Sequence, residues 1–399
     1  MTKSDDKRVP ALRFKGFTDE WEQRKLKNIT KRISRKNLNL DSTLPLTISA
    51  QYGLVDQRKF FDKQIASKKL ENYLLLKNGE FAYNKSYSKD YPFGAIKRLN
   101  NYKLGVLSTL YIAFKPVSIN TDYLEEYFDS TKWYKEIYKR ATEGARNHGL
   151  LNISPQDFFE LNLSIPNNRI EQERISKILK LLSLLITLQQ RKLERLKSLK
   201  KAYLRLIFNT SESIHYLKDI AEYRRGSFPQ PYTKREWYGG KDSQPFVQVA
   251  DVNTNLRLFS KTKETISKKA QQNSVFVPKD TIVVTLQGSI GRVAITQYDS
   301  YVDRTLLIIT KLKKRIDKYY LAYALQEKFN IEKRKAPGGT IKTITKSTLS
   351  NFAIILPNFE KQSQQSQTLK TIDNEIYLIN KKLDKLVQFK QFLLQNMFI

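Results

Sequence analysis

The sequence predicts an α/β (α+β) fold with two globular mixed domains and two long helices that form an antiparallel coiled coil, related by a pseudo-twofold duplication. Three observations predict it. The chain repeats itself at an offset of about 191 residues, strand-length apolar runs alternate with turn residues in both halves, and each half ends in a long heptad pattern. With 399 residues, 40% hydrophobic and 12% aromatic, the chain can bury one or two sizeable cores.

The repeat is patchy but keeps its order along the chain. Leu26 aligns with Leu217, and Ile29 aligns with Ile220. Further aligned pairs are Ile153 with Ile344, Ile165-Pro166-Asn167 with Leu356-Pro357-Asn358, Lys200 with Lys390, and Phe208 with Phe398. A register kept over a whole half indicates two copies of one unit. The copies predict an N-terminal segment (1–19), a first mixed domain (20–167), a first helical region (168–210), a second mixed domain (211–357) and a second helical region (358–399).

Within the mixed domains, short apolar runs bounded by Gly, Asn and Pro predict strands. Residues 111–114, 281–286 and 306–309 have this pattern. Residues 122–140 have the spacing of an amphipathic helix. Strands and helices therefore alternate in both domains.

The helical regions carry sustained heptads, which are typical of coiled coils. The predicted seam residues are Leu179, Leu182, Ile186, Leu193 and Leu196 in the first region and Ile372, Ile376, Ile379, Leu383 and Leu386 in the second. Lys200 and Lys390 fall on the two seams at equivalent positions. Since full burial of a lysine is unfavourable, we expect these side chains to extend toward water and to mark a register or an exit point.

Two arrangements of these helices fit the apolar stripes. Each helix can pack only on its own domain, as many amphipathic helices do. Alternatively, the two helices pair with each other in antiparallel fashion, with a mixed domain at either end of the pair. The equivalence of the two repeats favours pairing.

The charge of the chain indicates a polyanionic partner. Lysine and arginine total 71 against 39 acidic residues, and the net charge of +32 is spread along the chain. Such an excess is typical of proteins that bind nucleic acid, although some other basic proteins share it. No cysteine and only two histidines occur, which excludes disulfides and thiolate metal sites and predicts no metal site. No signal peptide or long apolar run occurs, so we expect no membrane contact and a cytoplasmic location.

Sequence signatures of DNA-acting enzymes are not found. The string Pro229-Gln230-Pro231-Tyr232 lacks the residue types of an amino-methyltransferase motif, and no phosphate-binding loop of the Gly-x4-Gly-Lys-Ser/Thr type occurs. We therefore predict no catalytic residue. A nuclease site scattered along the sequence stays open as an alternative, which would make the chain a self-sufficient DNA-acting enzyme.

Several loops combine basic or amide side chains with glycine, which lets a backbone approach phosphate. Amides suit adenine, and arginine suits guanine or phosphate. The predicted DNA-binding residues are Lys85, Tyr87, Lys89, Arg146, Asn147, His148, Arg224, Arg225, Lys234, Arg235, Gln287, Ser289, Arg292 and Lys342. For any one of them, a solvated loop charge is the competing interpretation.

The order of motifs resembles the specificity subunits of type I restriction-modification systems over nearly the whole chain. The opening segment 9–17 with Glu20-Trp21-Glu22 is similar to the family's start, and Gly226-Ser227-Phe228-Pro229 with Gly288-Ser289-Ile290-Gly291-Arg292 is similar to its target-recognition pattern. Ile165-Pro166 with Glu171-Gln172 resembles the start of the family's conserved helices. The second helix departs from this pattern, since Lys361 stands between Glu360 and Gln362.

This resemblance implies a non-catalytic subunit with two target-recognition domains, each of which reads one half of a split, asymmetric duplex DNA site with a fixed gap. It also implies two modification subunits and two restriction subunits as partners. S-adenosylmethionine, ATP and Mg²⁺ would be bound by those partners and not by this chain. A structural coiled-coil protein that binds nucleic acid without sequence preference is the remaining alternative.

Overall fold

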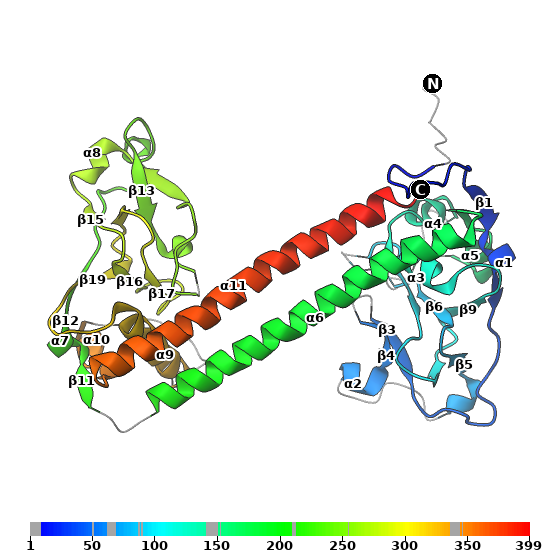
Figure 1. Ribbon diagram of the computed structural model, residues 1–399, viewed down its shortest axis with the longest axis horizontal. Coiled ribbons are helices and arrows are strands. Elements are labelled where there is room, and N and C mark those ends of the chain that lie inside the picture. The colour runs from blue at the N-terminus through cyan, green and yellow to red at the C-terminus, as the bar shows by residue number, and fades with distance from the viewer. Residues whose placement is uncertain are drawn as a thin grey trace. The chain divides into compact units, whose positions relative to one another are not determined.

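In the computed structural model (Figure 1), the chain forms two compact units. Unit 1 comprises Met1–Gln190 and Lys382–Ile399, and unit 2 comprises Arg191–Lys381. The structure describes residues 9–49, 52–61, 69–86, 88, 91–140, 151, 153–209, 213–253, 255–335, 344 and 346–399. Each unit holds one mixed α/β domain and one segment of each of two long helices.

An antiparallel four-stranded sheet forms the centre of unit 1. Its strands, in spatial order, are β2 (Thr30–Arg32), β9 (Ile112–Pro116), β6 (Phe81–Asn84) and β7 (Ala95–Arg98). Successive side chains of a strand point to opposite faces. On β6, Phe81 and Tyr83 therefore join one buried cluster and Ala82 joins another. The two central strands, β6 and β9, are buried on both faces at residues 81–83 and 112–114, which explains why these segments are continuous apolar runs.

Shorter elements surround this sheet. The strand pairs are β1 (Glu22–Lys25) with β10 (Asn162–Ile165), β3 (Leu46–Ser49) with β4 (Gly53–Asp56), and β5 (Leu74–Lys77) with β8 (Leu104–Leu107). The helices are α1 (Leu26–Ile29), α2 (Gln57–Phe61), the short 3-10 helix η1 (Leu70–Asn72), α3 (Thr121–Asp129), α4 (Tyr134–Arg140) and α5 (Pro155–Phe159).

The single helix expected over residues 122–140 is wrong in one respect, because the chain forms α3 and α4 instead. Ser130 has an extended backbone and ends α3. The chain then turns back, and the Nε1 of buried Trp133 donates a hydrogen bond to the carbonyl oxygen of Phe128 at 3.0 Å. Burial of this indole, with its hydrogen bond satisfied, stabilises the bend between α3 and α4.

Unit 2 has a corresponding four-stranded antiparallel sheet. Its order is β12 (Ala221–Arg225), β19 (Leu306–Leu312), β16 (Ile282–Thr285) and β17 (Val293–Ile295). A second sheet contains β14 (Glu264–Ile266), β13 (Gln244–Val247), β18 (Ser300–Val302) and β15 (Val275–Val277), and β11 (Ile214–Tyr216) pairs with β20 (Ala353–Ile355). The helices are α7 (Leu217–Ile220), α8 (Lys268–Gln271), α9 (Lys318–Lys335) and α10 (Lys346–Ser350), with the short 3-10 helices η3 (Arg235–Trp237) and η4 (Val249–Asp251).

Element order confirms the duplication inferred from the sequence. The order β2-β9-β6-β7 of unit 1 matches β12-β19-β16-β17 of unit 2, and each sheet is followed by a helix, α3 or α9, that packs on its last strand. The offset is 191 residues at α1 and α7, which begin at Leu26 and Leu217, but 201 residues at β6 and β16, which begin at Phe81 and Ile282. Differences in the central loops account for the patchiness of the sequence repeat.

Two long helices follow the mixed domains, α6 (Arg169–Phe208) and α11 (Phe359–Asn396). In unit 1 the first half of α6 lies beside the end of α11, and in unit 2 the second half of α6 lies beside the start of α11, so the helices pair antiparallel (Figure 1). Each helix also packs on its domain. Ile175 of α6 shares a cluster with Tyr123 as well as with Leu393 of α11, and Leu369 of α11 shares a cluster with Tyr320. Helix pairing and domain packing therefore occur together.

Asparagine caps begin both long helices. Asn168 Oδ1 accepts a hydrogen bond from the backbone N of Ile170 at 2.8 Å, and Asn358 Oδ1 accepts one from Lys361 at 2.9 Å. These bonds satisfy backbone donors that a helix start leaves free. Among the residues that the structure describes, no helix has the length and apolar character needed to cross a membrane.

Candidate nucleic-acid interface

Three loops of unit 2 leave the sheet β12-β19-β16-β17 at the same end. Arg225, the last residue of β12, lies opposite Leu307 of β19, and Val284 near the end of β16 lies opposite the same residue. Backbone bonds join the loops, from Gly226 N to Leu306 O at 3.1 Å and from Leu286 N to Thr305 O at 2.8 Å. This end carries five of the residues predicted to bind DNA, namely Arg224, Arg225, Gln287, Ser289 and Arg292.

The loop between β16 and β17 is held by Thr285. Its Oγ1 donates to the carbonyl oxygen of Ser289 at 2.5 Å and accepts from the backbone N of Arg292 at 2.9 Å. Gly288 and Gly291 have φ of +61° and +80°, the left-handed region that favours glycine. With the backbone fixed in this way, the side chains of Gln287 and Ser289 are exposed to solvent.

Cations that the sequence did not single out complete this surface. Arg304, just before β19, is exposed and lies 5.1 Å from the ring centroid of Tyr232. Burial lowers the pKa of Lys333 on α9, and the nearby Arg292 guanidinium lowers it further. Arg292 is half-buried and donates through Nη1 to the carbonyl oxygen of Val252 at 3.3 Å. We call Arg224, Arg225, Gln287, Ser289, Arg292, Arg304 and Lys333 the sheet-end surface.

Lys234 and Arg235 lie on a separate segment, at the start of the short 3-10 helix η3. Lys234 Nζ lies 3.4 Å from a carboxylate oxygen of Glu236 and 5.5 Å from the centroid of Trp237. Lys269 makes the same two contacts, at 3.0 Å and 5.2 Å. Both Lys234 and Arg235 are exposed to solvent, and Lys234 forms a surface ion pair.

In unit 1, only Lys85 among the predicted DNA-binding residues is described. It is half-buried, its Nζ donates to the carbonyl oxygen of Ile153 at 3.4 Å, and its own carbonyl oxygen accepts from the backbone N of Leu151 at 2.9 Å. These bonds anchor the loop after β6. The predictions for Tyr87, Lys89, Arg146, Asn147, His148 and Lys342 fall outside the described residues.

The predicted seam residues all lie on buried or half-buried sides of α6 and α11. Leu179, Leu193, Ile372 and Ile379 are buried, and Leu182, Ile186, Leu196, Ile376, Leu383 and Leu386 are half-buried. Lys200 is 16% exposed and forms a 2.5 Å ion pair with Asp373, while Lys390 is 18% exposed and lies 3.4 Å from Glu126. The two lysines are compensated by carboxylates, which the heptad pattern does not reveal.

The glutamines near the two helix starts make the same pair of hydrogen bonds. Gln172 donates to the carbonyl oxygen of Pro166 at 2.8 Å and accepts from Asn120 N at 2.9 Å. Gln362 donates to the carbonyl oxygen of Pro357 at 2.7 Å and accepts from Asp317 N at 3.1 Å. The lysine that interrupts the second Glu-Gln pair thus leaves the glutamine contacts intact.

The described part of the chain shows no grouping of three or more histidine, aspartate or glutamate side chains suited to hold a metal ion. Exposed arginines, together with an amide and a hydroxyl on the hydrogen-bonded loop between β16 and β17, can bind phosphate and base edges. Such a surface suits recognition of nucleic acid.

Comparisons with known proteins point the same way. Residues 214–388 match the family described as the type I restriction modification DNA specificity domain. A putative type I restriction enzyme MjaX specificity subunit of Methanocaldococcus jannaschii is 23% identical over 283 residues, which are 67% of this chain and 64% of that protein. The MjaVIII specificity subunit of the same organism is 26% identical over 130 residues, which are 33% of this chain and 31% of that protein. The chain thus matches less than two thirds of the length of either relative.

Solved structures share the fold over nearly the whole chain. The S subunit of a type I restriction-modification system from M. genitalium aligns with a TM-score of 0.63 at 14% identity and covers 98% of this chain and 99% of its own. A chain from a structure on complex assembly and conformational transition of the type I R-M system aligns with a TM-score of 0.53 at 14% identity, over 95% and 97% of the two chains. At these identities the likeness concerns the fold.

Proposed function

We propose that this chain is a specificity subunit of a type I restriction-modification system, which recognises duplex DNA sequence for partner subunits and catalyses no reaction itself. The observation that carries the proposal is the match of residues 214–388 to the DNA specificity domain. The sheet-end surface lies within that segment and supplies chemistry suited to DNA. The same topology in unit 1 supports a second recognition domain.

In this proposal each mixed domain reads one half of a split, asymmetric site. Lysine and arginine contacts to phosphate supply affinity but no sequence information, whereas each good base-edge contact supplies about 1–3 kcal/mol of discrimination. The paired helices α6 and α11 set the unread gap between the half-sites, much as protein geometry sets half-site spacing in dimeric binders.

The reactions belong to the partners. Two modification subunits bring S-adenosylmethionine and methylate adenine in each half-site, and two restriction subunits use ATP and Mg²⁺ for translocation and cleavage. The complex works in the cytoplasm. The residues proposed for base or phosphate contact are those of the sheet-end surface with Lys234, Arg235 and Lys85, together with the predicted residues outside the described part.

The test is to sequence the methylated genome of cells that express this chain with a modification subunit. We expect adenine methylation at one bipartite motif with a fixed gap, and none when the chain is left out. Methylation with no bipartite motif would contradict the proposal. In parallel, the purified chain is incubated with duplex DNA, Mg²⁺, ATP and S-adenosylmethionine, and cleavage or methyl transfer would instead indicate a self-sufficient enzyme.

A further inference from the structure

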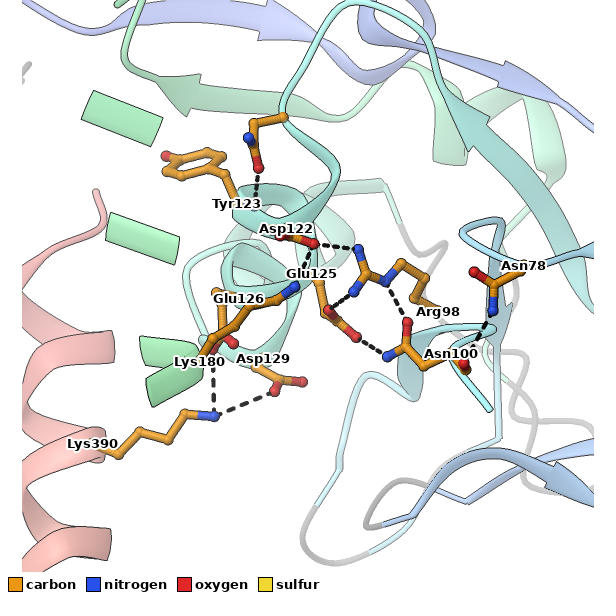
Figure 2. Close-up of polar contacts among 11 residues, drawn as sticks. Asn78, Arg98, Asn100, Asp122, Tyr123, Glu125, Glu126, Asp129, Lys180 and Lys390 are labelled. Carbon is orange, nitrogen blue, oxygen red and sulfur yellow. Dashed lines mark hydrogen bonds and ion pairs between the residues drawn. The ribbon is translucent and has the colours of Figure 1, made fainter. Parts of the chain in front are cut away.

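Helix α3 of unit 1 has an acidic face that meets cations from three other elements. Its carboxylates are Asp122, Glu125, Glu126 and Asp129 (Figure 2). The cations come from β7, from α6 and from α11. Strand β7 begins directly after Gly94, where the loop from β6 to β7 ends. In unit 2 the corresponding loop is the one between β16 and β17, which carries Gln287.

Asp122 is shared between β7 and α6. Arg98 Nη1 lies 2.7 Å and Lys180 Nζ lies 2.5 Å from the same oxygen, Oδ1 (Figure 2). Burial raises the pKa of Asp122, but the hydrogen bonds from Lys180 and Arg98 outweigh it, and the net pKa is lowered. The carboxylate is therefore charged at neutral pH and holds the two cations together.

Asp129 is shared in the same way between β7 and α11. Lys97 Nζ lies 2.7 Å from Oδ1, and Lys390 Nζ lies 3.7 Å from Oδ2. Lys97 is 19% exposed and Lys390 18%, so water screens these charges only in part. Without the carboxylates, Arg98 would face Lys180 and Lys97 would face Lys390 as like charges.

Among the residues of unit 2 that the structure describes, this arrangement is not repeated. Equivalent N-caps allow α3 to be aligned with α9. Asn120 accepts a hydrogen bond from the backbone N of Tyr123, and Asp317 accepts one from the backbone N of Tyr320. This alignment places Tyr319 and Gln326 where α3 has Asp122 and Asp129. The carboxylate that meets Lys200 is Asp373 of α11 instead, and Tyr323 of α9 donates to it at 2.6 Å.

We infer that α3 is a positioning element for the first recognition domain, and that Asp122 and Asp129 fix the strand behind its recognition loop to both long helices. The inference rests on the proposed function. Since the helices set the gap, a fixed link between loop and helices lets the complex reject sites whose gap is one base pair too long or too short. Asp122 and Asp129 then act on spacing, without contact to DNA.

The test uses the complex with modification subunits and a plasmid library that carries the cognate half-sites at the cognate gap and at gaps one base pair longer or shorter. The readout is the ratio of methylation at the cognate gap to methylation at the altered gaps. In D122N/D129N we expect this ratio to fall roughly tenfold, the effect of losing two partly buried ion-pair links. A fold defect alone would lower methylation at all sites equally and leave the ratio unchanged.

Glu125→Gln is the matched control. Glu125 lies on the same helix and contacts Arg98 at 2.6 Å and Asn100 at 2.6 Å, both outside the long helices (Figure 2). Its ratio should stay that of the wild type. An unchanged ratio in D122N/D129N, or an equal fall in E125Q, overturns the inference.

Two further variants keep the test decisive if D122N/D129N does not fold. K180M and K390M remove the same links from the helix side, and each should lower the ratio. Should both leave it unchanged, the inference fails. If the wild-type complex methylates no bipartite motif, the proposed function fails instead, so the two failures are distinguishable.

Discussion

Glu126 is a buried carboxylate on α3 whose environment favours its neutral form. It is 5% exposed, and its Oε2 lies 3.4 Å from Lys390 Nζ. Burial raises its pKa to about 7, Asp129 and Glu125 raise it too, and Lys390 lowers it in part. The folded chain thus holds a proton between pH 4.5 and 7 that the unfolded chain releases, so stability falls as pH rises through this window.

Glu126→Gln removes this ionisable group while keeping the shape of the side chain. At pH 8 we expect the variant to exceed the wild type in unfolding free energy by about 1–3 kcal/mol, the upper figure being the full linkage of a shift of this size. Near pH 4 the two should agree. Urea unfolding across pH 4–8 measures the difference.

Glu173→Gln serves as the control, because Glu173 is 55% exposed and pairs only loosely with Arg169 at 3.6 Å. It should stay within about 0.5 kcal/mol of the wild type at every pH. If the stability of the wild type relative to E126Q does not decline between pH 5 and 7, the raised pKa of Glu126 is contradicted.

Gly291 fixes the loop of the sheet-end surface. Its φ is +80°, and an added Cβ would lie 2.6 Å from the ring of Phe329 on α9. Gly291→Ala should therefore lower the unfolding free energy by about 2–4 kcal/mol, because left-handed strain adds to a clash in a packed core. Gly240→Ala is the control, since Gly240 has φ of +86° but nothing within 4 Å of its added Cβ. We expect a loss of about 1–2 kcal/mol there, and equal losses in the two variants would argue against the clash.

At the scale of elements, the heptad pattern of α6 separates buried seam positions from exposed positions that lie only two residues away. Leu179 is fully buried among residues of α3 and α11, whereas Leu181 is 56% exposed. Leu179→Ala should cost about 2–5 kcal/mol of stability because it opens a cavity. Leu181→Ala should change stability by no more than about 0.5 kcal/mol. Thermal unfolding of both variants checks the contrast, and a large loss in L181A would show that the helix is rotated from this packing.

Helix α6 is continuous for 40 residues and α11 for 38. Their apolar positions recur every three or four residues, and this local pattern locates each helix face without knowledge of its partner. The charged partners of Lys200 and Lys390 differ in kind, since one lies on the paired helix and the other on a domain helix. The heptad pattern does not predict which element supplies the partner of each lysine.

At the scale of the whole molecule, the proposed function makes the long helices a spacer. Four residues inserted into either helix lengthen it by about 6 Å, at about 1.5 Å per residue. We expect the gap of the methylated motif to change while both half-sites keep their sequences. Methylome sequencing of the variant complex reads both quantities, and an unchanged gap would refute the spacer role.

The sequence by itself determined the duplication, the two long helices and the faces on which they pack. These features depend on local patterns, namely apolar periodicity and the order of motifs along the chain. The strands at residues 111–114, 281–286 and 306–309 follow from the same kind of pattern and are confirmed as β9, β16 and β19. The bend between α3 and α4 was missed because the burial of Trp133 decides it.

Only the tertiary structure decided which polar side chains meet. Arg225, Arg292 and Arg304 gather at one end of a sheet because β19 lies between β12 and β16, a strand order that the chain order does not state. Asp122 and Asp129 of α3 likewise gain their role from cations far away in sequence on β7, α6 and α11. Apolar patterning acts over a few residues and is visible in a sequence, whereas charge pairing and loop convergence depend on distances that exist only after the chain has folded.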